Sequence, residues 1–190
     1  MKKLWFVAAG TAVALLPLSS IAVGGSAQAA SAQPATPVPA LAPANLTGPS
    51  VYKDENGKTL FVEDASTTAG ALAASSKCTP VSGRDNPHVT GGDASGHGWW
   101  GKGNCKNDYA DVYNCLYEYY TDGYWYKKAC SPTKKLKPYG GSTWRTNARK
   151  KCNSESKLIS WRNHVDVNVI DEPDTAEKPM NQAAIKCVAN

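Results

Sequence analysis

Two stretches of this sequence carry, at every second position, side chains suited to binding a ligand. Residues 110–130 form a tyrosine-rich strand pair, and residues 158–169 alternate between apolar and polar side chains. Flat aromatic rings beside polar donors and acceptors suit sugar rings, and tyrosine is enriched where proteins bind one another. We expect one binding face made of Tyr113, Tyr117, Tyr119, Tyr126, Lys128, Arg162, His164 and Asp166. Two plainer explanations stay open, because tyrosine forms strands well and an N-terminal hairpin could cover this face.

The charge of the chain is uneven, with a basic block between Lys127 and Arg162. This block has eleven lysines and arginines against one acid, Glu155, whereas five acids and two lysines follow it. Such a block attracts polyanions, which outside a cell include wall teichoic acids, anionic polysaccharide and DNA. The alternative is a solvated surface that keeps the protein from aggregating.

Catalytic patterns are weak. Ser95 and His97 lie two residues apart, but this spacing does not make a proton relay, and the nucleophile-elbow pattern is absent. His164 lies between Arg162 and Asp166 on one strand face without an identifiable nucleophile. The sequence therefore predicts a secreted, non-enzymatic binding protein for extracellular polysaccharide or another polyanion, with a small extracellular hydrolase as one alternative.

A second alternative is a protease inhibitor. Residues 131–138 contain Lys134, Lys135 and Lys137 and are bracketed by Pro132 and Pro138. A lysine presented on such a loop would suit a trypsin-like pocket. An ordinary turn between two strands explains the same residues.

All six cysteines follow residue 77, and an even number in a small exported domain indicates a disulfide framework. The cysteines are Cys78, Cys105, Cys115, Cys130, Cys152 and Cys187. The sequence has no C-x-x-C pair, and its three histidines, His88, His97 and His164, lack the spacing of metal ligands. We therefore expect no metal site and no cofactor.

The elements that position these residues read as short strands, punctuated by Gly, Pro and Asn, in an all-β domain over residues 77–190. Asp122-Gly123 is a strong signal for a two-residue hairpin turn. Counting outward from it places Glu118 opposite Lys127 and Cys115 opposite Cys130, close enough for a disulfide. In this register Ala110, Val112, Leu116, Tyr120, Trp125 and Ala129 share the core face.

An up-and-down strand order of the immunoglobulin type makes the strand at 158–170 a neighbour of the strand at 110–120. In this order the ends of the other strands also meet in pairs. The order favours the disulfides Cys78–Cys105 and Cys152–Cys187. The fold expected is a small, disulfide-stapled antiparallel β-sandwich.

The N-terminal region predicts export. Residues 1–30 have Lys2 and Lys3, an apolar run and an Ala27-Gln28-Ala29 cleavage pattern, as in a signal peptide. No cysteine lies near this cleavage pattern and no second apolar stretch follows, so we expect no membrane anchor and an extracellular protein. Residues 31–50 are Ala/Pro-rich and predict a disordered spacer. Residues 51–76 predict a small hairpin around Asn56-Gly57 and a second linker, which either docks on the main domain or belongs to a processed pro-segment.

Residues 78–190 contain several short motifs: Cys78, Asp85-Asn86-Pro87-His88, Gly103-Asn104-Cys105, Asn147-Ala148-Arg149-x-x-Cys152 and Val165-Asp166-Val167. With these motifs the chain resembles a group of small secreted actinomycete proteins. It implies export and a β-sandwich and implies no activity. The Cys115–Cys130 pair looks like an addition in this sequence.

Overall fold

A computed structural model describes residues 35–46, 48–64, 78–173 and 179–189, and its strands all lie in the compact unit Thr36–Asn190. The expected signal peptide (1–30), residues 31–34 and the second linker from residue 65 lie outside the described residues. The described part of the chain is all β-strand and turn, without a helix. Accordingly, nothing in that part is a helix with the length and apolarity to cross a bilayer.

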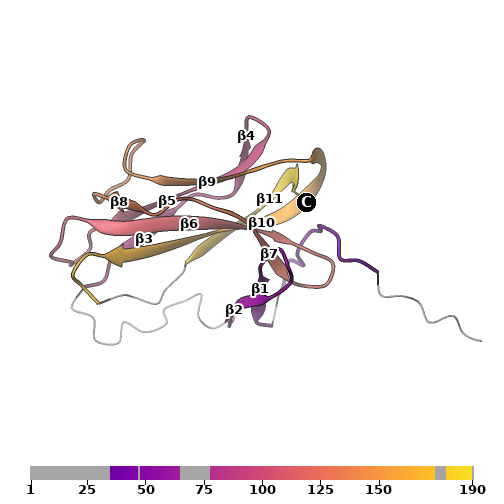
Figure 1. Cartoon of the computed structure of the whole chain (residues 1–190), viewed down its shortest axis with the longest axis horizontal. Coiled ribbons are helices and arrows are strands. Elements are labelled where there is room, and N and C mark those ends of the chain that lie inside the picture. The colour runs from indigo at the N-terminus through magenta and orange to yellow at the C-terminus, as the bar shows by residue number, and fades with distance from the viewer. Residues whose placement is uncertain (1–34, 47, 65–77, 174–178, 190) are drawn as a thin grey trace, which may run out of the picture. The chain divides into compact units, whose positions relative to one another are not determined.

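The strands form two sheets that pack as a sandwich (Figure 1). The larger sheet has the order β11-β10-β6-β7-β1-β2, with β8 also paired to β6. Its strands are β1 (Ser50–Lys53), β2 (Thr59–Glu63), β6 (Ala110–Tyr119), β7 (Trp125–Cys130), β8 (Lys134–Leu136), β10 (Ser154–Val169) and β11 (Met180–Val188). In the smaller sheet β3 (Val81–Arg84), β4 (His88–Thr90) and β9 (Thr146–Lys151) all pair with β5 (Asp93–Gly101). The disulfide-stapled β-sandwich and the expected neighbours β6 and β10 are thus confirmed.

The core between the sheets follows the period-two pattern of β10. Trp161, Val165 and their alternate neighbours point inward and are buried, in two clusters with residues of β5 and β6. The two largest inward rings are also hydrogen-bonded, since Trp100 Nε1 donates to Leu136 O (3.0 Å) and Trp161 Nε1 donates to Cys187 O (2.9 Å). The indoles therefore fill the core without leaving a buried donor unpaired, which would cost about 1–3 kcal/mol each.

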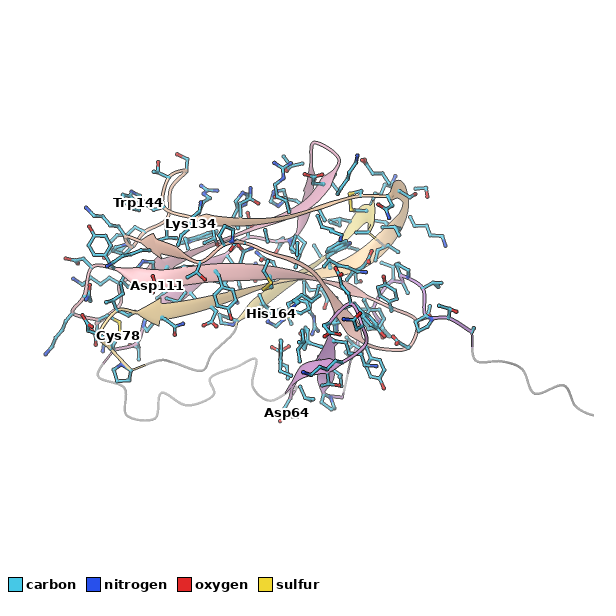
Figure 2. All side chains as sticks on the ribbon, in the orientation of Figure 1. Asp64, Cys78, Asp111, Lys134, Trp144 and His164 are labelled. Carbon is cyan, nitrogen blue, oxygen red and sulfur yellow. A yellow bond between two sulfur atoms is a disulfide. The ribbon has the colours of Figure 1, made fainter. Side chains whose placement is uncertain are left out.

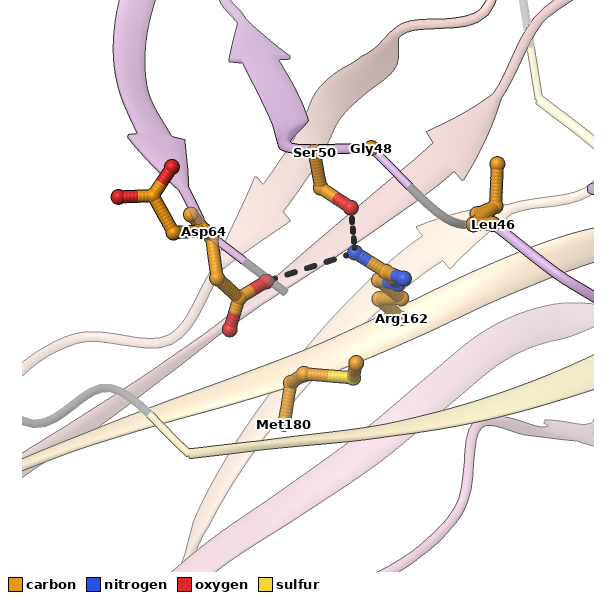
Figure 3. A pocket seen from close by; sticks show the side chains of 7 residues that line it. Leu46, Gly48, Ser50, Asp64, Arg162 and Met180 are labelled. Atoms are coloured by element: carbon orange, nitrogen blue, oxygen red, sulfur yellow. Dashed lines mark hydrogen bonds and ion pairs between the residues drawn. The ribbon is translucent and has the colours of Figure 1, made fainter. Parts of the chain in front are cut away.

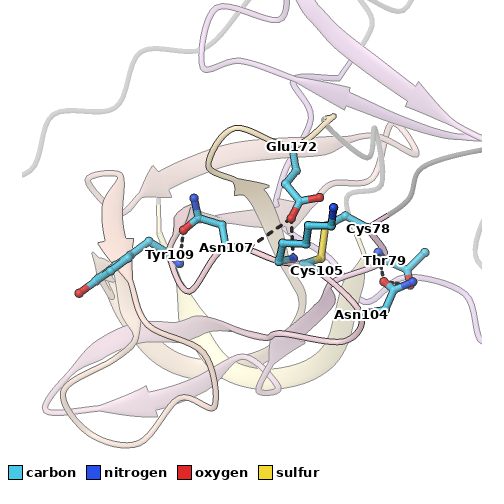
Figure 4. Close-up of a disulfide and its surroundings, with 8 residues drawn as sticks. Cys78, Thr79, Asn104, Cys105, Asn107, Tyr109 and Glu172 are labelled. Atoms are coloured by element: carbon cyan, nitrogen blue, oxygen red, sulfur yellow. Dashed lines mark hydrogen bonds between the residues drawn. A yellow bond between two sulfur atoms is a disulfide. The ribbon is translucent and has the colours of Figure 1, made fainter.

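Three disulfides join Cys78 to Cys105, Cys115 to Cys130 and Cys152 to Cys187, as the register and strand order indicated. Figure 4 shows the first of them beside Glu172, whose Oε1 accepts hydrogen bonds from Lys106 N (2.6 Å) and Asn107 N (3.3 Å). Each bridge stabilises a small domain by about 2–4 kcal/mol, largely by restricting the unfolded chain.

The β6–β7 hairpin departs from the expected register near its turn. Tyr120 N donates to Tyr124 O, so the loop holds three residues, and Gly123 takes the left-handed conformation (φ 87°) that such a loop requires. The residue pairs nearest the turn are therefore shifted by one residue from the expected register. The shift extends as far as Tyr117, which lies opposite Lys127. An irregularity between Leu116 and Tyr117 then restores the expected pairs, ending at Cys115↔Cys130.

This shift corrects three face assignments, because a one-residue slip moves a side chain to the other face of a sheet. Trp125, expected on the core face, lies opposite Tyr119 and packs with Tyr52 on the outer face. Tyr126 and Lys128, expected on the outer tyrosine face, lie on the Glu118 side instead. There the Tyr126 ring contacts Tyr120, and Lys128 Nζ reaches the Glu118 carboxylate.

The N-terminal segment is part of the fold. The β1–β2 hairpin docks on the main domain, where Tyr52 and Lys53 of β1 pair in parallel with Trp125 and Tyr126 of β7. The Ala/Pro-rich stretch expected as a spacer is packed from residue 36 onward: Ala40 N donates to Tyr119 O (2.9 Å) and Ser160 N donates to Ala40 O (3.1 Å). Its backbone forms hydrogen bonds with β6 and β10 just beyond Trp161↔Glu118, the last residue pair that joins these two strands. These bonds give partners to backbone N–H and C=O groups of the two strands that would otherwise lack them.

Candidate functional site

The tyrosine face expected to bind a ligand is covered by the N-terminal hairpin. Tyr117 and Tyr119 are only 5% and 6% exposed. Tyr52 of β1 and Phe61 of β2 pack against Tyr117, with ring-centroid distances of 4.9 Å and 6.1 Å. Tyr113 is half-buried at the margin of this cluster. Rings of the hairpin therefore take the place that a bound sugar would have against these tyrosines. The tyrosine face is covered by the N-terminal hairpin, which was one of the two plainer explanations left open from the sequence.

The polar row of β10 points to this same outer face, as expected, but it is buried as well. Arg162 donates to Ser50 Oγ (2.9 Å), also bonds the Tyr52 hydroxyl, and its guanidinium carbon lies 4.1 Å from the Trp125 ring centroid. His164 Nε2 lies 2.9 Å from the Tyr52 hydroxyl. Burial raises the pKa of Tyr52 well above its ordinary value, so this hydroxyl stays neutral and acts as a hydrogen-bonding hub.

Asp166 lies opposite Tyr113 in the β6–β10 register and is also buried. Of the eight residues expected on one face, the structure therefore brings together Tyr113, Tyr117, Tyr119, Arg162, His164 and Asp166. It leaves out Tyr126 and Lys128. The assembled group holds the hairpin to the sheet.

A shallow depression of about 140 Å³ opens beside Arg162 (Figure 3). Its lining residues are Leu46, Gly48, Ser50, Glu63, Asp64, Arg162 and Met180. The guanidinium already bonds Ser50 and pairs with Glu63 (3.4 Å) at the rim. The depression is small compared with ligand pockets of about 300–1,000 Å³, so it is a poor candidate for a binding site.

The two residues left out of the face form a different cluster, around Glu118. Glu118 is fully buried, its Oε1 accepts a hydrogen bond from Ala189 N (2.9 Å), and its Oε2 lies 3.4 Å from Lys128 Nζ. Burial raises the pKa of Glu118 and lowers the pKa of Lys128. Burial, followed by the hydrogen bond to Asp122, raises the pKa of Tyr126 to about 12. Glu118 and Lys128 therefore face each other inside the fold, where burial disfavours the charged form of each side chain.

The basic block is partly neutralised by ion pairs. Lys128 and Arg162 pair with Glu118 and Glu63, and two further members, the exposed Arg149 and the half-buried Lys150, also have partners. Arg149 Nε lies 3.0 Å from Asp93, and Lys150 Nζ lies 3.8 Å from Glu55. The surface cations that matter for a polyanion are therefore found elsewhere in the block.

Four of them gather around β8 and the loop that follows it, together with three aromatic rings. We call this the Lys/aromatic surface; its members are Tyr109, Lys134, Lys135, Lys137, Tyr139, Trp144 and Arg145. Lys137 Nζ lies 5.8 Å from the ring centroids of both Tyr109 and Trp144, and Lys135 Nζ lies 5.3 Å from Tyr109. Figure 2 shows Lys134 and Trp144 on this part of the ribbon.

Exposure distinguishes this surface from the tyrosine face. Tyr139 is 79% exposed and Trp144 is 38% exposed, although both are large aromatic side chains. The three lysines are exposed, and neither they nor Arg145 form an ion pair with any of the described carboxylates. Asp111 lies opposite Lys135 in the β6–β8 register. Cations and accessible rings are thus both available to a ligand from solvent.

The loop of the Lys/aromatic surface is held in an unusual backbone conformation. Tyr139, Gly140 and Gly141 all have positive φ (80°, 67° and 79°), which is uncommon for a residue such as tyrosine. Tyr139 N donates to Trp100 O (2.7 Å), and a Cβ on Gly140 would come within 3.0 Å of the Trp99 ring. Arg145 Nε also donates to Gly141 O (2.7 Å). These contacts hold the strained turn in place, and outliers of this kind cluster at functional sites.

The alternative functions gain little from the geometry. Ser95 Oγ donates to Asn147 Oδ1 (3.1 Å), whereas His97 Nδ1 bonds Asp85 Oδ2 (2.6 Å), so the two side chains have separate partners. Lys134 and Lys135, expected on an inhibitory loop, lie in β8 and pair with β6. Only Lys137 follows the strand, two residues before the strained turn that begins at Tyr139.

Three members of the Lys/aromatic surface were not predicted from the sequence: Tyr109, Tyr139 and Trp144. Tyr139 and Trp144 lie in the Gly-rich stretch 139–144, which carries no strand periodicity. The available signal was an aromatic residue at each end of that stretch, within the basic block.

In comparisons with known proteins, no family model, no curated protein sequence and no solved structure matches this chain.

Proposed function

We propose that this chain is a secreted, non-enzymatic protein that binds an anionic extracellular polysaccharide through the Lys/aromatic surface. The observation that carries the proposal is that Lys137 lies 5.8 Å from the exposed Trp144 ring and Lys135 lies 5.3 Å from the half-buried Tyr109 ring, and that neither lysine nor the adjacent Lys134 forms an ion pair with any of the described carboxylates. Three disulfides, with no free cysteine among the described residues, are typical of extracellular proteins. The signal-peptide pattern of residues 1–30 supports export.

The two kinds of side chain would recognise two features of such a ligand. Ring stacking suits the apolar C–H faces of sugars, and Trp144 and Tyr139 are accessible for it. Lysine ammonium groups attract carboxylate, sulfate or phosphate groups along the polymer. A neutral polysaccharide would use only the first interaction, and a polyanion without rings to stack would use only the second.

The experiment compares binding of purified protein to dextran sulfate and to neutral dextran, which share a backbone and differ in charge. We expect the triple variant Lys134→Gln/Lys135→Gln/Lys137→Gln to lose about tenfold or more in affinity for dextran sulfate, since these charges supply the steering field. The matched control is Lys151→Gln/Lys157→Gln, which removes two exposed bases of the same block. Trp144→Ala should weaken binding by about 1–3 kcal/mol, the range found for base stacking on aromatic side chains.

Three results would contradict the proposal. The first is that wild-type protein fails to bind dextran sulfate. The second is that the control double variant loses as much affinity per charge as the triple variant, which would indicate a nonspecific polycation. The third is equal affinity for DNA together with no effect of Trp144→Ala, because charge alone would then explain binding.

A further inference from the structure

Three residues that are separated in the sequence meet at an irregularity in the smaller sheet. β3 and β4 both pair with β5, and their registers, Arg84↔Gly98 and His88↔Ser95, differ by one residue. Asp85, Asn86 and Pro87 therefore lie opposite only Gly96 and His97. Such a bulge bends the strand and redirects a side chain. Here it brings Asp85 and His88 beside His97.

The distances within this group are short. Asp85 Oδ2 lies 2.6 Å from His97 Nδ1 and 4.0 Å from His88 Nδ1, and the two imidazole rings stack with centroids 5.4 Å apart. One ring nitrogen of each histidine and one carboxylate oxygen all lie within 4.8 Å of one another. All three side chains are partly exposed, so an ion from solvent can reach them.

Neighbouring hydrogen bonds orient the ligand atoms. Asp85 Oδ1 accepts from His97 N (2.7 Å), which fixes the carboxylate. His88 Nδ1 lies 2.9 Å from the Asn86 carbonyl oxygen. A carbonyl only accepts, so Nδ1 donates this hydrogen bond, and Nε2, rather than the Nδ1 atom that lies 4.0 Å from Asp85, is the nitrogen left to bind a metal ion. A metal-binding histidine commonly donates its second ring N–H to a carbonyl in this way.

A buried polar network holds the bulge from the core side. Asn163 of β10 is fully buried, and its amide nitrogen donates to Asp85 O (3.1 Å) and His97 O (2.9 Å). Its Oδ1 accepts from Asn114 Nδ2 (2.9 Å), which links it to a second fully buried asparagine. Gly96 is required beside this network, because a Cβ there would lie 2.7 Å from Asn163 Cγ. Fully connected buried networks make the site they support rigid.

We propose that Asp85, His88 and His97 bind a divalent transition-metal ion, with zinc as the ion to test. Two imidazoles and one carboxylate are a ligand set suited to zinc and its neighbours. On binding, the ion would displace the proton between His97 Nδ1 and Asp85 Oδ2 to solvent, these two atoms would move apart from their present 2.6 Å, and water would complete the coordination. This site was not expected from the sequence. The three residues come together only through the pairing of β3 and β4 with β5, which the spacing of the histidines along the chain does not reveal.

The test is calorimetric titration of the purified protein with ZnCl₂. We expect one zinc ion per protein molecule, with at least a tenfold loss of affinity in His88→Ala and in Asp85→Asn. His88 is a suitable target because its side chain is 39% exposed, so its removal should leave the fold intact. The matched control is Asp93→Asn, which changes a carboxylate of β5 that lies outside the proposed site and pairs with Arg149. This variant should bind zinc as the wild type does.

A second measurement guards against a variant that fails to fold. Without metal, His88→Ala should melt at the temperature of the wild type, and only the wild type and Asp93→Asn should melt higher in the presence of excess zinc, as linkage requires. Absence of stoichiometric zinc binding in the wild type would overturn the proposal. A zinc affinity equal to that of the wild type in a folded His88→Ala protein would also overturn the proposal. The three residues would then only form hydrogen bonds within the bulge.

Discussion

Replacing Tyr52 with alanine should undock the N-terminal hairpin and leave the sandwich folded. Tyr52 is fully buried, stacks on Phe61 with ring centroids 4.3 Å apart, and contacts Tyr117 and His164. Only two residue pairs join β1 to β7. The hairpin therefore depends on this side chain far more than on backbone pairing.

The size of the effect follows from what Tyr52 buries. Truncating a large buried aromatic side chain to alanine costs about 3–5 kcal/mol. Isolated two-stranded hairpins are marginally stable, so a loss of this size exceeds what holds the hairpin in place. Because about 1.4 kcal/mol is a factor of ten, protection of the β1 and β2 amides against hydrogen exchange should fall by about two to four powers of ten.

Hydrogen exchange resolved by residue is the assay. We expect exchange to accelerate in β1, β2 and the β1-facing end of β7, with β10 and β11 unchanged. Leu60→Ala is the matched control, since Leu60 is on β2 and 39% exposed, and such surface changes usually stay within about 0.5 kcal/mol. Equal loss of protection in β10 and β11 would refute the reasoning, because the hairpin would then be inseparable from the global fold. Unchanged protection in β1 and β2 would refute the anchoring role of Tyr52.

Three further changes test the packing. Replacing both Cys115 and Cys130 with alanine should lower the free energy of unfolding by about 3 kcal/mol, since the bridge closes a loop of about 15 residues, and urea unfolding that shows no loss would contradict this. Burial raises the pKa of Glu118, so the protonated side chain contributes fully to the free energy of unfolding below its ordinary pKa of 4.5. This contribution is lost as the pH rises through the raised pKa of the folded state. Glu118→Gln should remove that decline from the pH profile of unfolding, whereas a profile parallel to the wild type would show that Glu118 does not titrate abnormally. Asn163→Leu should destabilise by about 1–3 kcal/mol or more, because it leaves the Asp85 and His97 carbonyls without their buried donor, and an unchanged urea midpoint would refute the role of the network.

The sequence was sufficient for the large-scale features of the fold. The opposed Cys115 and Cys130 and the apolar alternation of β10 are local patterns, and both are found in the structure. The immunoglobulin-type strand order then placed the other two disulfides, because it specifies which strand ends meet. Turn chemistry and side-chain alternation act over a few residues and can therefore be recognised in a single sequence.

What could not be predicted depends on contacts between distant segments. Asp122-Gly123 favours a two-residue loop, but Gly123 also suits the left-handed position of a three-residue loop, and the difference moved Trp125 and Tyr126 across the sheet. The outward positions of β10 looked like a solvent-facing polar row because nothing local shows that Tyr52 will cover them.

The surfaces now favoured have the same origin. Trp144 is placed beside Lys137 by the β8–β9 connection, and Asp85 meets the two histidines only because β3 and β4 pair with one edge of β5 in registers that differ by one residue. The physical reason is shared: side chains far apart along the chain are brought together by strand pairing, which local patterns do not encode.

The most direct test of the proposed function is the salt dependence of affinity for dextran sulfate. A plot of log affinity against log salt concentration has a slope that reports the cations in contact with the polymer, and removing one such lysine reduces it by about one. The triple variant at Lys134, Lys135 and Lys137 should therefore lose about three from the wild-type slope, with a residual, salt-insensitive affinity that Trp144→Ala removes. An unchanged slope in the triple variant would contradict binding through the Lys/aromatic surface.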